Sequence, residues 1–432
     1  MKDAISRRHA LGTMLAAAAG VGLTACASSS SAGSKSGTSS AGAATFWTLQ
    51  DPTNTVQQAA VTAFNSTGHG TVTLAIEPTN GYLDKLRTAM GSSEMPGLFF
   101  SWGGGNLDQY AQAGKLVDLS PALESHYLSS ALQAGIYNGK LIGVPIRGTQ
   151  PEFIFYNKNV FQAAGVEPPT TYSELLTLVS VFKKKGIIPF AVAGTAVNSW
   201  TELIWVEYLV DRVGGPSVFK AISGGDWSQW GNPAVLQAAQ MIKELVGAGA
   251  FGTSFASVNY GAGGTSTLLY TGKAAMCLMG SWEYANQAGF SASFAKNDLG
   301  YLPFPSVEGG KGNPANVSGN PTNYLSVTTS APLQTATDFL ATTYSDSYVK
   351  GLVGMGEVPV TTNTKAALAN SADPAYSNFL YELVENTPSF TQSWDQALGT
   401  TLATPMLTQI QELFNGQVTP QQFVSNVLAI KG

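Results

Sequence analysis

The chain has 432 residues, of which 44% are hydrophobic and 11% are charged, and its formal net charge at pH 7 is -5. A chain of this length exceeds what one hydrophobic core usually organises, so we expect two lobes. An acidic chain without a basic face excludes nucleic acid as a partner, because phosphates are bound by clustered Lys and Arg. The low charge and the many Gly, Ser, Thr, Asn and Gln residues favour a neutral polar ligand.

The first 25 residues have the features of an export signal. Arg7 and Arg8 precede small and apolar residues from Leu11 to Ala25, a run too short to span a bilayer permanently. The paired arginines are typical of a twin-arginine signal. The run ends in Leu-Thr-Ala-Cys, which resembles a bacterial lipobox, so cleavage before Cys26 would leave a lipid-bearing N-terminus. An ordinary secretory signal is the alternative.

The next segment is expected to be a flexible tether. Residues 27–43 contain only Ser, Gly, Ala, Thr and Lys35. Such a segment has no apolar surface to bury and cannot offset the entropy lost on ordering. We therefore expect residues 26–43 to hold a folded body away from a membrane.

Strand-like and helix-like segments alternate through the rest of the chain. The expected strands are 44–49, 72–76, 97–101, 152–156, 187–192 and the apolar run 275–279, and the expected helices are 53–67, 82–90, 107–113, 172–185, 201–213, 233–248, 334–343, 374–384, 405–414 and 420–429. Thr419 before Pro420 is a typical helix start. The alternation predicts an α/β fold in which each lobe has a mainly parallel sheet flanked by helices. In such sheets ligands bind beyond the carboxyl ends of the strands.

Few residues are available for catalysis or metal binding. Cys277 lies in the apolar run 275–279 and is expected to be a small core residue. His69 and His126 show no metal-ligand spacing, and no Gly-x-Ser-x-Gly elbow or Asp-x-Asp-x-Asp loop is present in the sequence. We therefore expect no metal and no cofactor, and triad catalysis is poorly supported.

Several segments resemble one family. Residues 272–282 (GKAAMCLMGSW) are similar to a segment typical of family 1 extracellular solute-binding proteins, the carbohydrate receptors of ABC importers. Residues 138–145 (NGKLIGVP), 153–158 (FIFYNK), 168–175 (PPTTYSEL) and 416–420 (GQVTP) continue the resemblance over nearly the whole chain. Gly97 departs from the pattern, because relatives usually carry an aspartate after the proline at position 96.

The resemblance implies a maltose-binding-protein-like fold, the type II-like periplasmic-binding-protein architecture of two lobes joined by hinge crossovers. The implied N-terminal lobe comprises residues 44–148 and 323–357, and the C-terminal lobe comprises 149–322 and 358–432. Crossings are expected near 147–153, 318–324 and 356–362. The resemblance also implies delivery of the sugar to an ABC transporter permease. Together with the lipobox-like residues before Cys26, it leads us to expect a monomer that is anchored by its N-terminal lipid to the outer face of the cell membrane.

Aromatic side chains are the first candidates for contacts with such a ligand, because sugars present flat C–H faces. Trp282 ends the family-like run and follows its predicted strand, Trp102 and Trp47 lie at strand ends, Trp394 precedes a helix, and Trp200 lies near a helix start. For each of them, a partly buried core aromatic is the alternative.

Polar groups must pair with the sugar hydroxyls, since an unpaired buried group costs about 1–3 kcal/mol. The candidates lie beside the aromatics or at the expected crossings: Gly103, Arg147, Gln150, Glu152, Glu283, Asn323, Tyr324 and Asp395. Glycine would let the backbone approach a ligand closely. Arginine suits a bidentate grip on hydroxyls, although a structural salt bridge explains Arg147 equally well.

Two functions remain open on these residues. The first is a receptor that binds a neutral di- or oligosaccharide without chemistry of its own, and xylo-, cello-, malto- and chito-oligosaccharides all fit. The second is a secreted glycosidase, in which two carboxyl groups flank the scissile bond. Glu152, Glu283 and Asp395 are the candidate acids, but nothing in the sequence pairs them. We favour the receptor.

Overall fold

The computed structural model describes residues 42–78 and 81–430. The expected export signal, the Cys26 lipidation site and all but the last two residues of the 26–43 tether lie outside these ranges and stay predictions. Within the two ranges, no helix has both the length and the hydrophobicity that crossing a bilayer requires.

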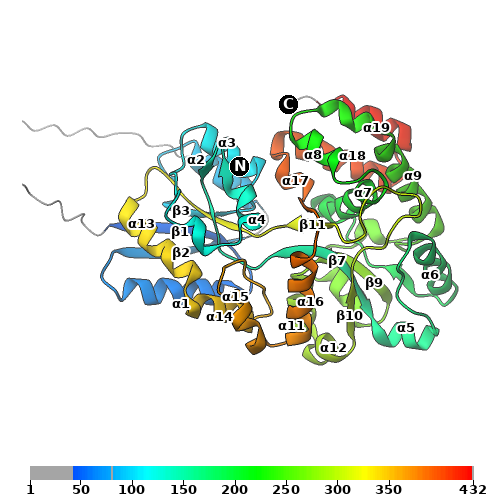
Figure 1. Cartoon of the computed structure of the whole chain (residues 1–432). Coiled ribbons are helices and arrows are strands. Elements are labelled where there is room, and N and C mark those ends of the chain that lie inside the picture. Colours follow the sequence, from blue (N-terminus) through cyan, green and yellow to red (C-terminus); the bar gives the residue numbers. More distant parts are fainter. Residues whose placement is uncertain (1–41, 79–80, 431–432) are drawn as a thin grey trace, which may run out of the picture. The chain divides into compact units, whose positions relative to one another are not determined.

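The first of two large sheets has the strand order β2-β1-β3-β12-β6, and its strands β1, β2 and β3 are labelled in Figure 1. Its strands are β1 Ala43–Leu49, β2 Thr71–Glu77, β3 Leu98–Ser101, β6 Val144–Pro145 and β12 Tyr324–Val327, and its helices include α1 Asn54–Asn65, α2 Tyr82–Met90, α3 Gly105–Gln112 and α13 Leu333–Leu340. Apolar side chains from both layers form one core, in which the Phe339 ring of α13 packs against Phe46 of β1 and Phe64 of α1.

The second sheet has the order β13-β11-β7-β9-β8, and β10 also pairs with β7. Its strands are β7 Gln150–Asn157, β8 Ile188–Phe190, β9 Ala274–Gly280, β10 Leu299–Leu302, β11 Val317–Asn320 and β13 Phe390–Gln392, and its longer helices are α5 Lys158–Ala164, α6 Tyr172–Lys184, α7 Ser199–Gly214, α9 Pro233–Ala248, α16 Pro374–Glu385, α18 Thr400–Phe414 and α19 Pro420–Leu428. This sheet has its own core, and Cys277 is fully buried in it, as expected.

The remaining strands and α-helices lie between these elements. They are the hairpin β4 Ile136–Tyr137 and β5 Lys140–Leu141, and the helices α4 Ser129–Leu132, α8 Ser217–Ser223, α10 Gly264–Tyr270, α11 Glu283–Phe290, α12 Ala292–Asn297, α14 Asp346–Gly354, α15 Thr364–Ala367 and α17 Trp394–Ala397.

Local sequence signals fix several helix starts. Thr171 and Glu174 form a reciprocal capping box at α6, and Thr419 and Gln422 form another at α19, where Pro420 is the first helical residue. Each box satisfies two backbone N–H groups that would otherwise have no partner. The predicted start at Thr419 is therefore confirmed.

Strand directions are more mixed than the mainly parallel sheets that we expected. β1 is parallel to β2 and β3, but β12 is antiparallel to both of its neighbours. β7 is likewise antiparallel to β9, β10 and β11. A helical crossover enforces parallel strands only within one sheet, whereas β7 and β12 are each reached from the other sheet.

The helix predicted at 405–414 begins earlier than expected, at Thr400, and Pro405 lies inside it. Proline disfavours a helix interior because it removes one backbone hydrogen bond. Here Ala403 and Met406 on either side of Pro405 are buried, and this packing offsets the loss.

The chain passes between the two sheets three times: two passages lie at the expected places 147–153 and 318–324, and the third lies between β12 and β13, an interval that includes 356–362. It leaves the first sheet after β6 and enters the second at Gln150, and it returns between β11 and Tyr324. At the third place, the Thr149 N–H donates to the Val358 carbonyl oxygen at 2.8 Å, and Gly148 bridges to Pro359. The outgoing segment is therefore hydrogen bonded to the segment near 356–362.

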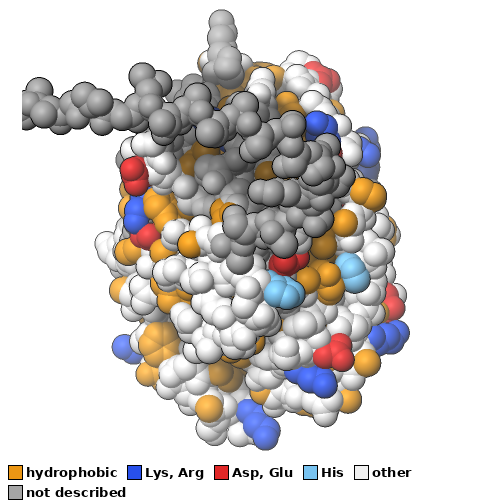
Figure 2. All heavy atoms as spheres, turned by 90° about the vertical axis from the view of Figure 1, so that its left-hand side faces the viewer, with side chains coloured by type: hydrophobic (Ala, Val, Ile, Leu, Met, Phe, Trp, Pro, Cys, Tyr) orange, Lys and Arg blue, Asp and Glu red, His pale blue; other side chains and the backbone are white. Residues whose placement is uncertain are grey.

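Charged side chains are sparse on the surface. On the part of the face in Figure 2 that is not grey, Lys, Arg, Asp and Glu lie scattered among hydrophobic side chains and white polar or backbone atoms rather than gathered in one patch. This face agrees with the polar, mostly neutral surface inferred from the composition.

Candidate functional site

Two half-buried tryptophans lie near each other where β9 ends. A Cβ added to Gly280 would overlap three atoms of the Trp282 ring, the farthest of them at 2.5 Å, so the ring lies directly against the strand. Trp200, in the first turn of α7, has its ring centroid 6.1 Å from that of Trp282 and packs edge-on against Tyr260 at 5.0 Å. The structure therefore brings two of the predicted tryptophans together at the carboxyl end of a strand.

Buried polar side chains lie on the same face of the sheet. Glu152 of β7 is directly opposite Gly280 of β9, and opposite residues project from one face. Gln150, two residues earlier, projects from that face too. Its register partner Asn320 donates through Nδ2 to Gln150 Oε1 at 3.5 Å, and all three polar side chains are at most 4% exposed. Two predicted polar residues thus adjoin the tryptophans.

Two further carboxyl groups lie close to Glu152. Glu207 of α7 accepts hydrogen bonds from Ser393 Oγ and from the Trp394 backbone N–H, both at 2.8 Å, which fixes the start of α17. Asp395 follows in the first turn of that helix. These three carboxyl groups come from three elements far apart in the sequence.

Burial makes these groups bind protons more tightly than usual. Desolvation raises the pKa of Glu152 well above its ordinary value, and the charges of Glu207 and Asp395 raise it further. Desolvation raises the pKa of Glu207 to about 8, against three hydrogen bonds, with the Trp394 backbone, Ser393 and Glu152, that lower it. Desolvation also raises the pKa of Asp395 to about 6. The site therefore concentrates carboxyl groups whose charged forms are disfavoured.

The glycine loop after β3 contacts protein instead of lining open space. A Cβ on Gly103 would lie 2.5 Å from the Ala134 carbonyl oxygen, on Gly104 2.5 Å from Gln392 Oε1, and on Gly105 2.7 Å from the Gly399 nitrogen. Gln392 Nε2 also donates to the Trp102 carbonyl oxygen at 2.9 Å. The expectation that Gly103 makes room for a ligand is corrected, because protein atoms occupy that space. Trp102 itself is half-buried and packs edge-on against Phe100.

Two predicted aromatic contacts are core residues. Trp394 is 1% exposed, because its ring stacks on Phe219 at 4.4 Å and meets Trp230 at 5.4 Å. Tyr324 is fully buried, and its hydroxyl donates to the Ala131 carbonyl oxygen at 2.6 Å. In both cases neighbours distant in the sequence fill the space that a ligand would need.

Glu283 and Asn323 are also buried, but with different partners. The Glu283 carboxylate accepts hydrogen bonds from Gln287 Nε2 at 2.7 Å and Tyr260 Oη at 3.2 Å, so protein donors already occupy it. The Asn323 carbonyl oxygen accepts from the Ile146 N–H, while its Nδ2 has no partner within residues 42–78 and 81–430. Asn323 therefore has an unpaired side-chain donor at the second crossing among the described residues, whereas the Glu283 carboxylate is already hydrogen bonded to protein side chains.

Arg147 forms the structural salt bridge that was its alternative explanation. Its Nη1 lies 2.7 Å from Asp51 Oδ2, and Nη2 pairs with Glu357 Oε1. The other Glu357 oxygen accepts the Gly148 N–H at 2.7 Å. Arg147 thereby joins the loop after β1 to the first and third crossing segments.

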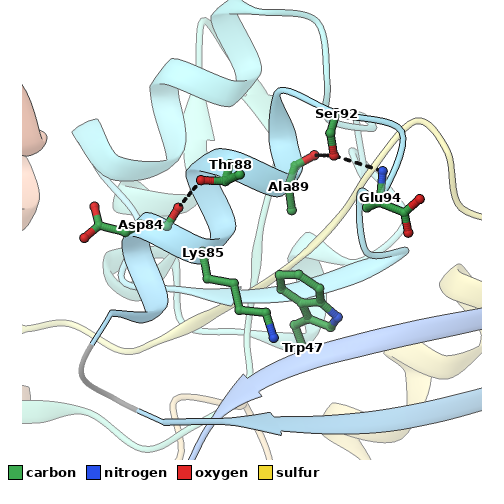
Figure 3. Close-up of a pocket in the computed structure, with 7 residues that line it drawn as sticks. All are labelled: Trp47, Asp84, Lys85, Thr88, Ala89, Ser92 and Glu94. Carbon is green, nitrogen blue, oxygen red and sulfur yellow. Dashed lines mark hydrogen bonds between the residues drawn. The ribbon is translucent and has the colours of Figure 1, made fainter. Parts of the chain in front are cut away.

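Trp47 lies in a separate place. It lines a pocket of about 420 Å³ together with residues of α2 and the loop after it (Figure 3): Asp84, Lys85, Thr88, Ala89, Ser92 and Glu94. Lys85 Nζ lies 4.6 Å from the centre of the Trp47 ring and pairs with Glu77 at 2.6 Å. The structure shows no contact of Trp47 with the Trp200–Trp282 pair.

Glu207, Asn320 and Gln392 were missed from the sequence. Glu207 lies in a helix whose side chains are buried on nearly every side, so its periodicity gives no sign of a site. The available signal was composition, because a buried helix seldom carries a glutamate without a cationic partner. Across the described part of the chain, no three His, Cys, Asp or Glu side chains converge closely enough to hold a metal ion.

Comparison with known proteins gives consistent matches. A family model described as bacterial extracellular solute-binding protein matches residues 47–350. An uncharacterised ABC transporter extracellular-binding protein of Pyrococcus horikoshii is 24% identical over 51% of this chain and 49% of its own, and the xylose/arabinose-binding protein XacG of Haloferax volcanii is 27% identical over 49% and 46%. The chain thus spans about half the length of these curated relatives. A structure from work on xylan utilisation by Caldanaerobius polysaccharolyticus has a TM-score of 0.81 at 25% identity, covering 89% of this chain and 99% of that one.

Proposed function

This chain belongs to the bacterial extracellular solute-binding proteins, and from that membership we propose that it binds a di- or oligosaccharide and delivers it to the permease of an ABC importer. The family and the two-lobed α/β fold class predicted from the sequence are confirmed. The sugar is proposed as ligand because the relative in Haloferax volcanii carries the name xylose/arabinose-binding protein.

The observation that carries the proposal is the Trp200–Trp282 pair beside buried polar groups. Aromatic faces suit the C–H faces of a sugar ring, and Gly280 fixes the orientation of Trp282. Glu152 and Gln150 project from the same face of the sheet and offer acceptors for hydroxyl groups. Apolar plates with a few placed polar groups are the usual composition of a small-molecule site.

We propose the division into lobes that the sequence predicted. The N-terminal lobe would comprise 44–148 and 323–357, and the C-terminal lobe 149–322 and 358–432. Two sheets with separate hydrophobic cores support this division, as do the three passages of the chain between them. The ligand would lie between the lobes, with hinge bending read by the permease.

We propose that the sugar is released intact. The family is one of solute-binding proteins, and of the three candidate acids Glu283 is already hydrogen bonded to protein donors. The other two, Glu152 and Asp395, have raised pKa values. Burial alone accounts for these shifts, so they are no evidence of catalysis.

An extracytoplasmic location follows from the family. We propose in addition that lipid on Cys26 anchors the chain to the outer face of the cell membrane and that the receptor is a monomer. The lipobox-like residues before Cys26 support the anchor.

A thermal-shift screen of the full chain against neutral oligosaccharides tests the function, followed by chromatography of each sugar. A ligand that binds only the native state stabilises it by about 4 kcal/mol at a thousand times its Kd. We expect a clear shift with unchanged sugar. No shift with any sugar would refute the receptor, and shortened sugar would establish hydrolysis instead.

A further inference from the structure

One loop residue connects the two segments that carry the Trp200–Trp282 pair. Tyr260 is half-buried and lies in the loop between α9 and α10. Trp200 lies in the first turn of α7, and Trp282 directly precedes α11. Because the three residues lie in different parts of the sequence, tertiary contacts must set the position of one tryptophan relative to the other.

The first connection runs from Tyr260 to the start of α7. The Tyr260 backbone N–H donates to Asn198 Oδ1 at 3.0 Å, and Asn198 lies two positions before Trp200. The Tyr260 ring packs edge-on against the Trp200 ring, with centroids 5.0 Å apart and planes at 82°. Edge-to-face packing favours one relative orientation of two rings. Tyr260 thus contacts both the helix start and the ring that it carries.

The second connection runs from Tyr260 to α11. Tyr260 Oη donates to Glu283 Oε2 at 3.2 Å and accepts from Asn286 Nδ2 at 2.7 Å. Glu283 directly follows Trp282, is fully buried, and accepts from Gln287 Nε2 at 2.7 Å through its other oxygen. A tyrosine hydroxyl has one hydrogen to donate. That hydrogen is used inside the protein, on the helix that begins after Trp282.

The loop is closed behind Tyr260. The Gly263 N–H donates to the Tyr260 carbonyl oxygen at 2.7 Å, and Gly263 has a φ of +69°, which glycine adopts at low cost. Phe290, the last residue of α11, packs on Gly263, since a Cβ added there would overlap its ring. Tyr260 therefore lies on a turn that is itself packed against α11.

Trp200 has few other aromatic contacts. Among the aromatic pairs of the described residues, it occurs in two, with Tyr260 and with Trp282. The Trp282 ring lies against Gly280 of β9, so the strand sets its position. Tyr260 is then the aromatic side chain that orients Trp200 toward it.

We propose that Tyr260 is a positioning residue of the sugar site, which sets the separation of 6.1 Å and the angle of 54° between the Trp200 and Trp282 rings. This inference rests on the proposed function, in which a sugar packs on these rings. Tyr260 acts through the two tryptophans and does not touch the ligand. Glu283 is accordingly the buried anchor of Tyr260, which replaces the ligand contact that the sequence suggested for it.

Two variants of Tyr260 remove its connections one after the other. Tyr260→Phe removes the bonds to α11 and keeps the ring edge on Trp200, whereas Tyr260→Leu removes both. The full chain is titrated by calorimetry with xylobiose, cellobiose, maltose and N,N′-diacetylchitobiose, and the disaccharide that binds the parent most tightly is used. We expect Tyr260→Phe to weaken its binding about threefold and Tyr260→Leu about tenfold, because binding must then order a ring that the parent holds in advance.

Tyr381 provides a matched control. It is half-buried in α16, and its hydroxyl donates to Glu385 Oε1 at 3.2 Å, the same kind of bond that Tyr260 makes to Glu283. Tyr381→Phe and Tyr381→Leu therefore remove the same groups at a place without a tryptophan of the site. We expect both to change the affinity less than about twofold.

A double-variant cycle separates positioning from direct contact. In Trp200→Ala one of the two rings is gone, so the placement of one ring relative to the other no longer matters. Tyr260→Phe and Tyr260→Leu should then each change the affinity less than about twofold. A Tyr260 side chain that touched the sugar would weaken binding by the same factor in both backgrounds.

A spectroscopic measurement on the full chain needs no sugar. The protein is labelled with 5-fluorotryptophan, and the fluorine resonance of Trp200 is identified by its loss in Trp200→Phe. Tyr260→Phe keeps the aromatic ring beside Trp200, so a moved or broadened Trp200 resonance reports a displaced or mobile tryptophan. We expect this change in Tyr260→Phe and not in Tyr381→Phe. The fully buried tryptophans of the core show whether each variant is folded: Trp205, Trp230 and Trp394.

The outcomes separate this inference from the proposed function. Equal weakening by Tyr260→Phe in the parent and in Trp200→Ala would overturn the inference, because the hydroxyl would then contact the sugar. Unchanged affinity in both Tyr260 variants, or a Trp200 resonance that Tyr260→Phe leaves in place, would also overturn it. A parent chain that binds none of the four disaccharides would count against the proposed function instead. The fluorine spectra would then still decide whether Tyr260 holds Trp200.

Discussion

Gly280 is the residue whose substitution most directly tests the geometry of the site. In Gly280→Ala, the added methyl group would lie at most 2.5 Å from three atoms of the Trp282 ring. Carbon atoms pack at about 3.5–4.0 Å, so the ring must retreat by roughly 1 Å or more. Overpacking of this kind costs about 1–3 kcal/mol of stability, and the displaced ring no longer presents its face to the ligand.

We expect Gly280→Ala to weaken sugar binding about tenfold or more, which corresponds to about 1.4 kcal/mol. Calorimetry measures the affinity, and denaturant unfolding monitored by circular dichroism measures the stability. The matched background is Trp282→Ala, in which the added methyl group has no ring to meet. The double variant should therefore bind and unfold like Trp282→Ala alone.

Either of two results would refute a role of Gly280 in positioning the Trp282 ring. Gly280→Ala with unchanged affinity and stability would mean that the ring does not depend on this glycine. Additive losses in the double variant would mean that the methyl group acts on the strand itself, because independent sites add and contacting sites do not.

Three other substitutions follow from the structure. Arg147→Met leaves the carboxylates of Asp51 and Glu357 without their cation, and since breaking a buried pair costs about 3 kcal/mol or more, a clearly lower denaturant midpoint is expected; an unchanged midpoint would contradict a structural role. Glu207 has its folded-state pKa raised to about 8 against about 4.3 unfolded, so the folded state binds more protons and stability falls as pH rises between these values; Glu207→Gln should flatten that slope in unfolding curves at several pH values, and a slope equal to the parent's would count against it. Gly105→Ala places a methyl group 2.7 Å from a backbone nitrogen of the segment after α17, so we expect weaker ligand binding by calorimetry, and full affinity would show that this contact is dispensable.

The sequence predicts the early part of the fold well because its local signals are strong. The first five elements, from β1 to β3, occur in the predicted order. In each of these segments the apolar residues recur with the period of a helix or a strand. The strands β6, β11 and β13 are two to four residues long and were not predicted. Elements this short are specified by their partners in the sheet, which a local pattern does not contain.

The site was predicted less completely for a related reason. The sequence pointed to Trp282 because a family-like run ends there, and to Glu152 because it lies in the first predicted crossing, 147–153. Trp394 was wrong because Phe219 and Trp230 cover its ring, and both lie more than 150 residues away in the sequence. Glu207 was missed because a helix buried on nearly all sides shows no polar face. Contacts across such separations depend on the tertiary fold.

The tryptophan face and the buried polar groups of the site contribute to binding in different ways. The tryptophan face is built within the second sheet, by Gly280 and the start of α7, and it needs no contact from the first sheet. Contact between the sheets is made where Gln392 donates to the Trp102 carbonyl oxygen and where the glycine loop meets α17. Near the site, Glu152 Oε2 and Asn320 Oδ1 are buried acceptors that the described protein atoms leave unpaired, at about 1–3 kcal/mol each.

A ligand that pairs with both of these acceptors therefore supplies several kcal/mol to the arrangement in which they are buried. A shift from 1:99 to 99:1 between two conformations requires about 5.5 kcal/mol of differential binding, so the polar groups are sufficient to drive it. Stacking on Trp282 contributes equally to both conformations and shifts neither. Gly280→Ala should consequently lower affinity without changing the extent of the ligand-induced conformational change seen by small-angle scattering, whereas Glu152→Gln should reduce that change at saturating ligand. Equal effects of the two substitutions on scattering would refute this division.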